Sequence, residues 1–209
     1  MGGLCVSQGI KSPGGEDLML TIEAVFYALI LLFGIIGMSR GWVREALATA
    51  GILLAMFILQ TFGDKIVGAM IGVAGIQEAN RVKFFTFIVK ASIFGFITFF
   101  AYYGPAMARP PTRLGFLQRA QLGIQETLLG FIFGLLNGYL IAGNLWFYLK
   151  ETGYPLPPEL FIWYNPREKQ ALTEAGQRLA RYLPPEFLKG MKLYGVFALF
   201  ILFVIIALT

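Results

Sequence analysis

Apolar residues along the chain fall into five long runs separated by more polar connections. The runs occupy residues 18–38, 46–62, 84–103, 128–149 and 191–209, and each contains at most one charged side chain. A helix needs about 20 apolar residues to cross about 30 Å of hydrocarbon, because each residue adds about 1.5 Å. A helix also satisfies its own backbone hydrogen bonds, which lipid cannot do. The pattern therefore predicts an all-α, polytopic transmembrane bundle with about five spans.

The connections between the first four runs differ in kind. Residues 39–45 form a tight hairpin, which predicts that the first two spans are antiparallel neighbours. Residues 63–83 contain a short apolar run at 66–76, which is too short to span and predicts a re-entrant or interfacial piece. Residues 104–127 carry arginines and helix-breaking prolines, and we expect a loop there.

Two further stretches are expected to lie outside the hydrocarbon. Residues 1–17 are glycine-rich and polar, and they predict a flexible tail. Within the connection 150–190, prolines and aromatic side chains at 154–164 predict an extended segment on the headgroup layer. From Asn165, a capping pattern and apolar residues at helical spacing predict an amphipathic surface helix. This helix either covers the bundle and its lipid or docks a partner.

Composition supports a lipid environment. Of the 209 residues, 57% are apolar, 15% aromatic and 14% charged, and the mean hydropathy is +0.69. Soluble domains carry about 25% charged residues, and a chain of this size cannot bury so much apolar surface in water. The composition excludes a soluble enzyme, an extended nucleic-acid binder and a disordered polypeptide. The net charge of +5 indicates loop lysines and arginines facing anionic headgroups, with no nucleic-acid partner.

Two residue types that support much of enzyme chemistry are scarce. The sequence has no histidine, and Cys5 is its one cysteine. Histidine ligands for zinc or haem, histidine-based nucleophilic catalysis and an intrachain disulfide are therefore excluded. We expect no cofactor, no metal and no enzymatic activity, because catalysis needs positioned titratable groups.

The fourth apolar run carries small and amide side chains on one face. Gly130, Gly134 and Gly138 recur every four residues, and at 100° per residue they share an arc of about 120° with Asn137 and Asn144. Small residues let another backbone approach closely, and amides bond across such a contact. The pattern predicts a tight helix–helix interface. An intrachain partner is favoured, while a homo-oligomer contact and a polar pore lining remain as alternatives.

Two ionisable residues lie within predicted spans. Glu23 lies near the start of the first, and Lys90 lies seven residues into the third. A charge within the bilayer is costly, so each side chain is expected to reach the interface or to form a structural pair. A role in transport or gating is the alternative, although a transporter normally shows several such residues on facing helices.

The hairpin and the fourth run together resemble the colicin V production protein (CvpA) family. Residues 37–45 are similar to the family's Gly-x-x-Arg-Gly-x-x-Arg-Glu hairpin. The matching positions are Gly37, Arg40, Gly41, Arg44 and Glu45. The glycines of the fourth run resemble the family's repeated Gly-x-x-x-Gly segment, but Asn137 stands where the family often has Lys or Arg. The resemblance covers residues 18–149 and leaves the 154–164 segment, the surface helix and the fifth span as additions.

The resemblance implies a bacterial inner-membrane protein linked to colicin V export or production and to envelope integrity. It carries over no catalytic residue. From the residues themselves, Arg40 and Arg44 are expected to bind lipid phosphates or to cap the last carbonyls of the first span. Their position favours a cytoplasmic hairpin with the N-terminus outside.

The sequence leaves three candidate functions. The first is a non-enzymatic, CvpA-like membrane protein that supports export or envelope processes. The second is an accessory or structural subunit of a larger respiratory or photosynthetic membrane complex. The third is a small channel or transporter. Membrane lipids and other membrane-protein subunits are the expected partners, with a second copy of the chain as a further one.

Overall fold

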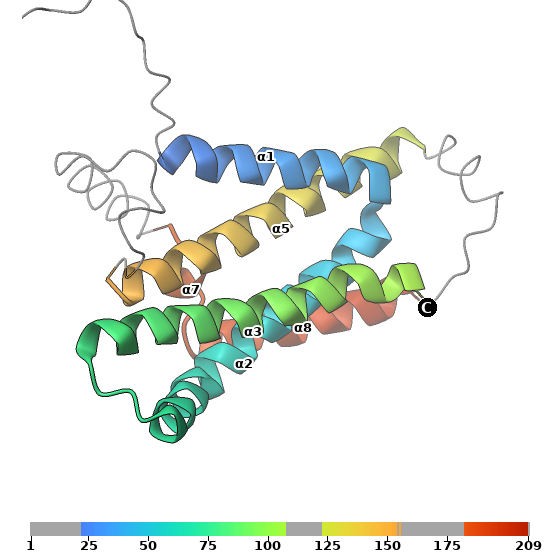
Figure 1. Cartoon of the computed structure of the whole chain (residues 1–209). Helices are drawn as coiled ribbons and strands as arrows, with labels where there is room; N and C mark the ends of the chain where they lie inside the picture. The colour runs from blue at the N-terminus through green and yellow to red at the C-terminus, as the bar shows by residue number, and fades with distance from the viewer. Residues whose placement is uncertain (1–21, 108–122, 154, 156–181, 209) are drawn as a thin grey trace, which may run out of the picture.

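The computed structural model describes residues 22–107, 123–153, 155 and 182–208 (Figure 1). Within these residues the regular structure is α-helical and contains no strand, which confirms the predicted all-α bundle. The predicted tail at 1–17 and the amphipathic helix predicted from Asn165 lie outside the described residues.

Six helices make up the described fold. They are α1 (Ile22–Arg40), α2 (Trp42–Ala74), α3 (Ala79–Met107), α5 (Ile124–Glu151), α7 (Pro184–Phe187) and α8 (Met191–Leu208). By length and composition, α2, α3 and α5 are each able to cross a membrane, and α1 and α8 carry shorter apolar stretches. At about 1.5 Å per residue, α1 and α8 are nonetheless close to the thickness of the hydrocarbon layer.

The second helix is longer than the sequence pattern predicts. It runs without a break for 33 residues, so the prediction of a separate, re-entrant piece at 66–76 is wrong, while an interfacial position of this end of α2 stays a prediction. The helix ends only at Gly75, which adopts the left-handed conformation with φ 64° and donates its N–H to Ile71 O. Asp64 does not interrupt it, because the Asp64 carboxylate points out to Lys90 of α3.

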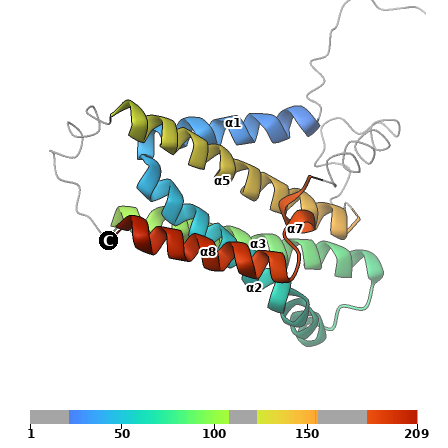
Figure 2. The same ribbon diagram turned by 180° about the vertical axis from the view of Figure 1, so that it is seen from behind.

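The helices pair in an order that differs from their order in the chain. The first helix, α1, lies along α5, and α2 lies along α3, while α2 also contacts α5 and α8 (Figures 1 and 2). From the turn at Gly41, which has φ 82°, α1 and α2 diverge. The expectation that they are antiparallel neighbours is therefore wrong beyond the turn. The cause is a close approach between glycines of α1 and α5.

One apolar core joins α2, α3, α5 and α8. Its buried members include Ile52, Met56, Phe94, Leu140 and Leu193. Aromatic contacts extend it outward, including the stacked rings of Phe57 and Phe197, whose centroids lie 5.6 Å apart. The first helix has a smaller core of its own with α5, in which Phe26 packs beside Ala142. The attachment of α1 to the bundle therefore depends on α5.

Candidate functional site

The predicted glycine face of α5 lies against α1 of the same chain. The glycines concerned are Gly130, Gly134 and Gly138. A Cβ atom added to Gly134 would overlap Phe33 O and would lie 3.0 Å from Gly34 Cα and 3.1 Å from Gly37 Cα. Real side chains do not fit at such distances, so the two backbones are in direct contact. We refer to this contact as the glycine seam.

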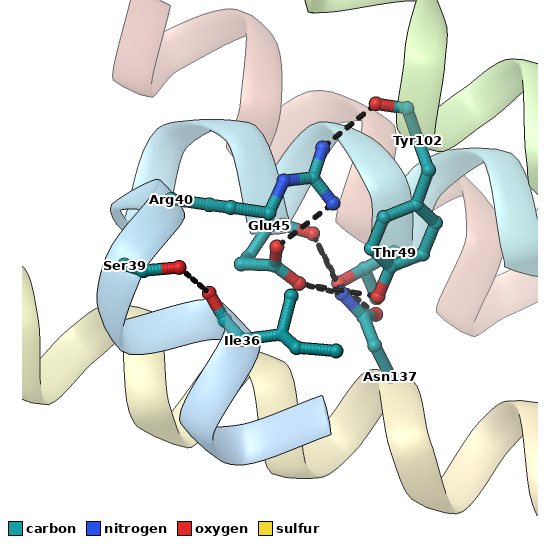
Figure 3. Close-up of polar contacts among 7 residues, drawn as sticks. All are labelled: Ile36, Ser39, Arg40, Glu45, Thr49, Tyr102 and Asn137. Carbon is teal, nitrogen blue, oxygen red and sulfur yellow. Dashed lines mark hydrogen bonds and ion pairs between the residues drawn. The ribbon is translucent and has the colours of Figure 1, made fainter. Parts of the chain in front are cut away.

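Five polar side chains from four helices meet where α1 turns into α2 (Figure 3). They are Arg40 of α1, Glu45 and Thr49 of α2, Tyr102 of α3 and Asn137 of α5. Glu45, Thr49 and Asn137 are buried, and the Glu45 side chain is 0% exposed. We refer to this group as the Glu45 centre.

The Glu45 carboxylate is compensated on both oxygens. Oε1 forms an ion pair with Arg40 Nη1 at 3.1 Å but accepts no hydrogen bond from the described residues. Oε2 accepts hydrogen bonds from Asn137 Nδ2 at 2.8 Å and from the Tyr102 hydroxyl at 3.2 Å. A charge removed from water needs such partners, because desolvation costs several kcal/mol for an isolated ion.

Arg40 joins α1 to α3 as well as to Glu45. Its Nη2 donates to Tyr102 O at 2.7 Å, and its guanidinium lies 4.4 Å from the centroid of the Tyr102 ring. We expected Arg40 to cap the last carbonyls of the first span or to bind lipid phosphate. Instead it binds α3, and Ser39 Oγ donates to the α1 carbonyl of Ile36 at 2.7 Å. Arg44 is half-buried, and its expected contact with lipid stays a prediction.

Asn137 connects α5 to α2 through both ends of its amide. Besides its bond to the carboxylate, Nδ2 donates to Glu45 O at 3.0 Å, and Oδ1 lies 2.7 Å from the Thr49 hydroxyl. That hydroxyl also lies 2.9 Å from Glu45 O, and its single proton serves one acceptor at a time. The amide thus bonds across a helix contact, but to α2, whereas the glycines that share its predicted face contact α1.

Asn144 shares the same face of α5 but uses its amide differently. It is buried, yet its Nδ2 donates to Leu140 O of its own helix at 2.6 Å. Its Oδ1 lies 3.5 Å from the Tyr148 hydroxyl, also on α5. The structure therefore records no cross-helix bond for Asn144, in contrast to Asn137.

A second charged group lies at the other end of the bundle. Lys90 Nζ on α3 lies 2.9 Å and 3.0 Å from the two carboxylate oxygens of Glu151 on α5, and 3.0 Å from Asp64 Oδ1 on α2. The Lys90 side chain is 6% exposed, whereas that of Glu151 is 38% exposed and that of Asp64 is 91% exposed. We refer to this group as the Lys90 centre.

The two centres are far apart along α5. Asn137 and Glu151 are 14 residues apart on α5, which corresponds to about 20 Å of helix. The apolar core lies between the two ends. Lys90 is thus a structural pair, one of the two roles expected for it. Glu23 lies in α1, but its side chain is outside the described part of the structure.

Several partners in these centres are not apparent from sequence. Thr49 has a detectable signal, because it lies four residues after Glu45 and so shares its helix face. Tyr102 lies on a different helix from its partner Glu45, and Asp64 and Glu151 lie on different helices from their partner Lys90. No sequence pattern links these residues to their partners. In the described residues no group of three or more His, Cys, Asp or Glu side chains could hold a metal ion.

These features define a helical membrane protein whose intramembrane polar groups join its own helices. A family model described as Colicin V production protein matches residues 22–163, about two thirds of the chain. The chain therefore belongs to the colicin V production protein family. A search of curated proteins and a search of solved structures each found no match.

The match contains the glycine seam and both centres. It extends beyond residue 149 to residue 163. The segment 154–163, which we expected to be an addition to the family's core, is therefore part of the matched region. Helices α7 and α8 lie outside the match.

Proposed function

We propose that this chain is a non-enzymatic, multi-pass protein of the bacterial inner membrane that supports export or envelope processes as a structural component. The observation that carries the proposal is the Glu45 carboxylate. It is fully buried, and both of its oxygens face partners within the chain, namely Arg40, Tyr102 and Asn137. An acid that is buried and paired in this way holds helices together and is out of reach of a substrate in this conformation, although Oε1 has room for one further hydrogen bond.

The same argument disfavours a channel or transporter. Such a protein needs intramembrane polar groups that meet water or substrate. Lys90, Asn137 and Asn144 are the side chains that a transport path would be expected to reach, and all three are buried in this conformation. Each is bonded to a group of the same chain.

Complementation of a deletion strain tests the structural role. Export and outer-membrane permeability are scored for the wild type, for Glu45→Ala and for Asp64→Asn, a control at the exposed edge of the Lys90 centre. We expect Asp64→Asn to restore the phenotype and Glu45→Ala to fail, with a matching loss of folded protein. An ion flux through reconstituted vesicles that Lys90→Met abolishes would overturn the proposal in favour of a channel.

A second candidate is an accessory subunit of a larger membrane complex. Four large aromatic side chains form an exposed ladder on α3: Phe96, Phe99, Phe100 and Tyr103. Phe99 stacks on Tyr103 with centroids 4.4 Å apart, and Phe96 lies 4.7 Å from Phe100. A preassembled aromatic face buries a large area at little conformational cost, which suits packing against another membrane chain.

Native purification in mild detergent tests this candidate. A second chain at fixed stoichiometry is expected to be lost in Phe96→Leu/Phe99→Leu/Phe100→Leu. It should be kept in a control triple that changes exposed phenylalanines elsewhere, Phe62→Leu/Phe84→Leu/Phe203→Leu. A chain that migrates alone, or only as copies of itself, would contradict the accessory role.

We also propose that the N-terminus lies outside and the hairpin between α1 and α2 faces the cytoplasm. Arg44 supports this orientation, whereas the charge of Arg40 is largely used by Glu45. The single cysteine, Cys5, allows a direct test. A membrane-impermeant maleimide should label it in intact spheroplasts, and labelling only after lysis would reverse the orientation.

A further inference from the structure

The short helix α7 is fixed on α5 by close packing. Pro184 and Pro185 are buried, and a Cβ atom added to Gly143 of α5 would overlap the Pro184 ring. The link that follows is held by α2, because Gln60 Nε2 donates to Leu188 O at 3.0 Å. The segment between α7 and α8 thus has a defined position at the end of the bundle where α5 finishes (Figure 2).

This position brings lysines from two parts of the chain together. Lys189 Nζ lies 6.0 Å from the centroid of the Phe147 ring of α5, and Lys192 Nζ lies 5.7 Å from the centroid of the Phe187 ring. Lys150 comes from the last turn of α5. Ammonium groups held over aromatic faces keep a preferred position at an exposed site. We refer to these three lysines as the lysine cluster.

Nearby acids do not cancel the charge of the cluster. Glu186 lies 2.9 Å from Lys189 Nζ. That hydrogen bond, assisted by the charge of Lys150, lowers the pKa of Glu186 below its ordinary value. The neighbouring Glu151 is bonded to Lys90. Among the described residues, the three lysines and Glu186 carry a net charge of +2. The Lys90 centre beside them carries −1, because Lys90 is shared by Glu151 and Asp64.

Exposed apolar side chains lie in the same segment. Tyr182, Phe187 and Met191 are all strongly exposed, and they precede, form part of or follow α7. Lysines beside exposed aromatic and aliphatic groups are typical of protein surfaces at the boundary between headgroups and acyl chains. Phosphate groups carry the negative charge that such a boundary offers.

We propose that the lysine cluster, together with Phe187 and Met191, is a binding surface for the headgroups of anionic phospholipids. The ammonium groups bind the phosphate, and the exposed apolar side chains lie among the first acyl carbons. A zwitterionic headgroup has no net charge, so it binds more weakly. The surface is independent of the export role, because it requires only that the chain lies in a bilayer.

The test uses the purified full-length chain in a neutral detergent. Binding of fluorescent phosphatidylglycerol and of fluorescent phosphatidylcholine is measured by titration. Each lysine that lies against the bound headgroup contributes about fivefold to affinity. In Lys150→Gln/Lys189→Gln/Lys192→Gln we expect phosphatidylglycerol affinity to fall at least about tenfold, with phosphatidylcholine affinity unchanged.

The end of α2 and the start of α3 supply a matched control. They carry three exposed basic residues, Lys65 of α2 and Arg81 and Lys83 of α3. One of them, Arg81, is paired three residues away, as Lys189 is with Glu186. Lys65→Gln/Arg81→Gln/Lys83→Gln removes the same charge. We expect it to change phosphatidylglycerol affinity by less than about twofold, since no aromatic surface is shared.

Other outcomes would overturn the proposal. An equal loss of phosphatidylglycerol affinity in both triple variants would mean that the net charge of the protein, and not the lysine cluster, determines binding. Equal affinity for both lipids would contradict the preference for anionic headgroups. Competition by inorganic phosphate at low millimolar concentration would identify a free-phosphate site instead. Should the triple variant not fold, Lys192→Gln alone must still lower phosphatidylglycerol affinity, and the triple Lys→Arg variant must retain it.

Discussion

The Glu45 centre and the Lys90 centre each hold a charged side chain in the interior of the bundle, but with partners of different exposure. Each places one charged side chain out of water and joins three or four helices around it. The partners of Glu45 are themselves largely buried, whereas Asp64, a partner of Lys90, is 91% exposed. Breaking a bond of the Glu45 centre leaves a buried polar group that water does not reach. Breaking a bond of the Lys90 centre leaves an exposed acid, to which water can bind in place of Lys90. The two ends of the bundle should therefore differ strongly in their tolerance of substitution.

The two centres also differ in which helices they hold. The Glu45 centre includes Arg40 of α1, whereas the Lys90 centre joins only α2, α3 and α5. The first helix is therefore attached by the glycine seam, its small apolar core with α5 and the Glu45 centre. Loss of α1 from the bundle should leave the Lys90 centre in place.

The largest effect is expected from opening the glycine seam. Gly134→Leu would insert a side chain where Phe33 O and the Cα atoms of α1 already lie, with a cost of about 4 kcal/mol or more. Hydrogen exchange should rise along α1 and around Glu45 but not around Lys90. Gly95→Leu on α3 is the control, because a Cβ there meets nothing within 4 Å. Equal damage from both variants would contradict a specific seam.

Removing the buried acid should have the next largest effect. Glu45→Ala leaves Arg40 without its ionic partner and Asn137 Nδ2 without the carboxylate, at an expected cost of about 3–5 kcal/mol. The free energy of unfolding is measured by titrating mild detergent micelles with sodium dodecyl sulfate while following circular dichroism. The double variant Arg40→Met/Glu45→Leu should recover part of that loss. A loss of unfolding free energy below about 1 kcal/mol in Glu45→Ala would contradict the expected difference between the two centres.

Lys90→Met should cost less than Glu45→Ala. The acids that it leaves behind are Asp64 and Glu151, and both are exposed at the surface of the chain, so the expected loss is about 1 kcal/mol. The same denaturation measurement applies. A loss as large as that of Glu45→Ala would show that exposure of the partners does not decide the cost.

The smallest effect is expected at the outer edge of the Lys90 centre. Asp64→Asn should change the free energy of unfolding by less than about 0.5 kcal/mol, because Glu151 binds Lys90 through both oxygens. Glu151→Gln in the same background then tests whether one acid suffices for Lys90. A clear additional loss is expected, and its absence would mean that Lys90 is stable without an anion.

Much of the fold follows from the apolar runs, since lipid admits few alternatives to helices. The extent of α2 does not follow, because Gly63, Asp64 and Lys65 resemble the start of a connection in sequence. In the structure they are helical, Asp64 lies 3.0 Å from Lys90 of α3, and the helix ends only at the left-handed Gly75. Such a partner is visible only once α2 and α3 are placed side by side.

The sequence predicts which helix faces contribute to the candidate site, but not which residues bond to one another there. Helical periodicity places Asn137 and Asn144 on one arc, yet only Asn137 bonds across to α2. Glu45 is part of the hairpin motif in sequence, but α2 begins at Trp42 and carries it inward. Its partner Tyr102 is 57 residues away, beyond any local pattern.

The pairing of α1 with α5 has a consequence for biogenesis. Between the end of α1 and the start of α5 the ribosome adds 83 residues, which takes roughly 4–17 s at about 5–20 residues per second. During that interval α1 has been synthesised, but α5, which its glycines contact, has not. We expect a chaperone or the insertase to protect α1 until α5 has been synthesised.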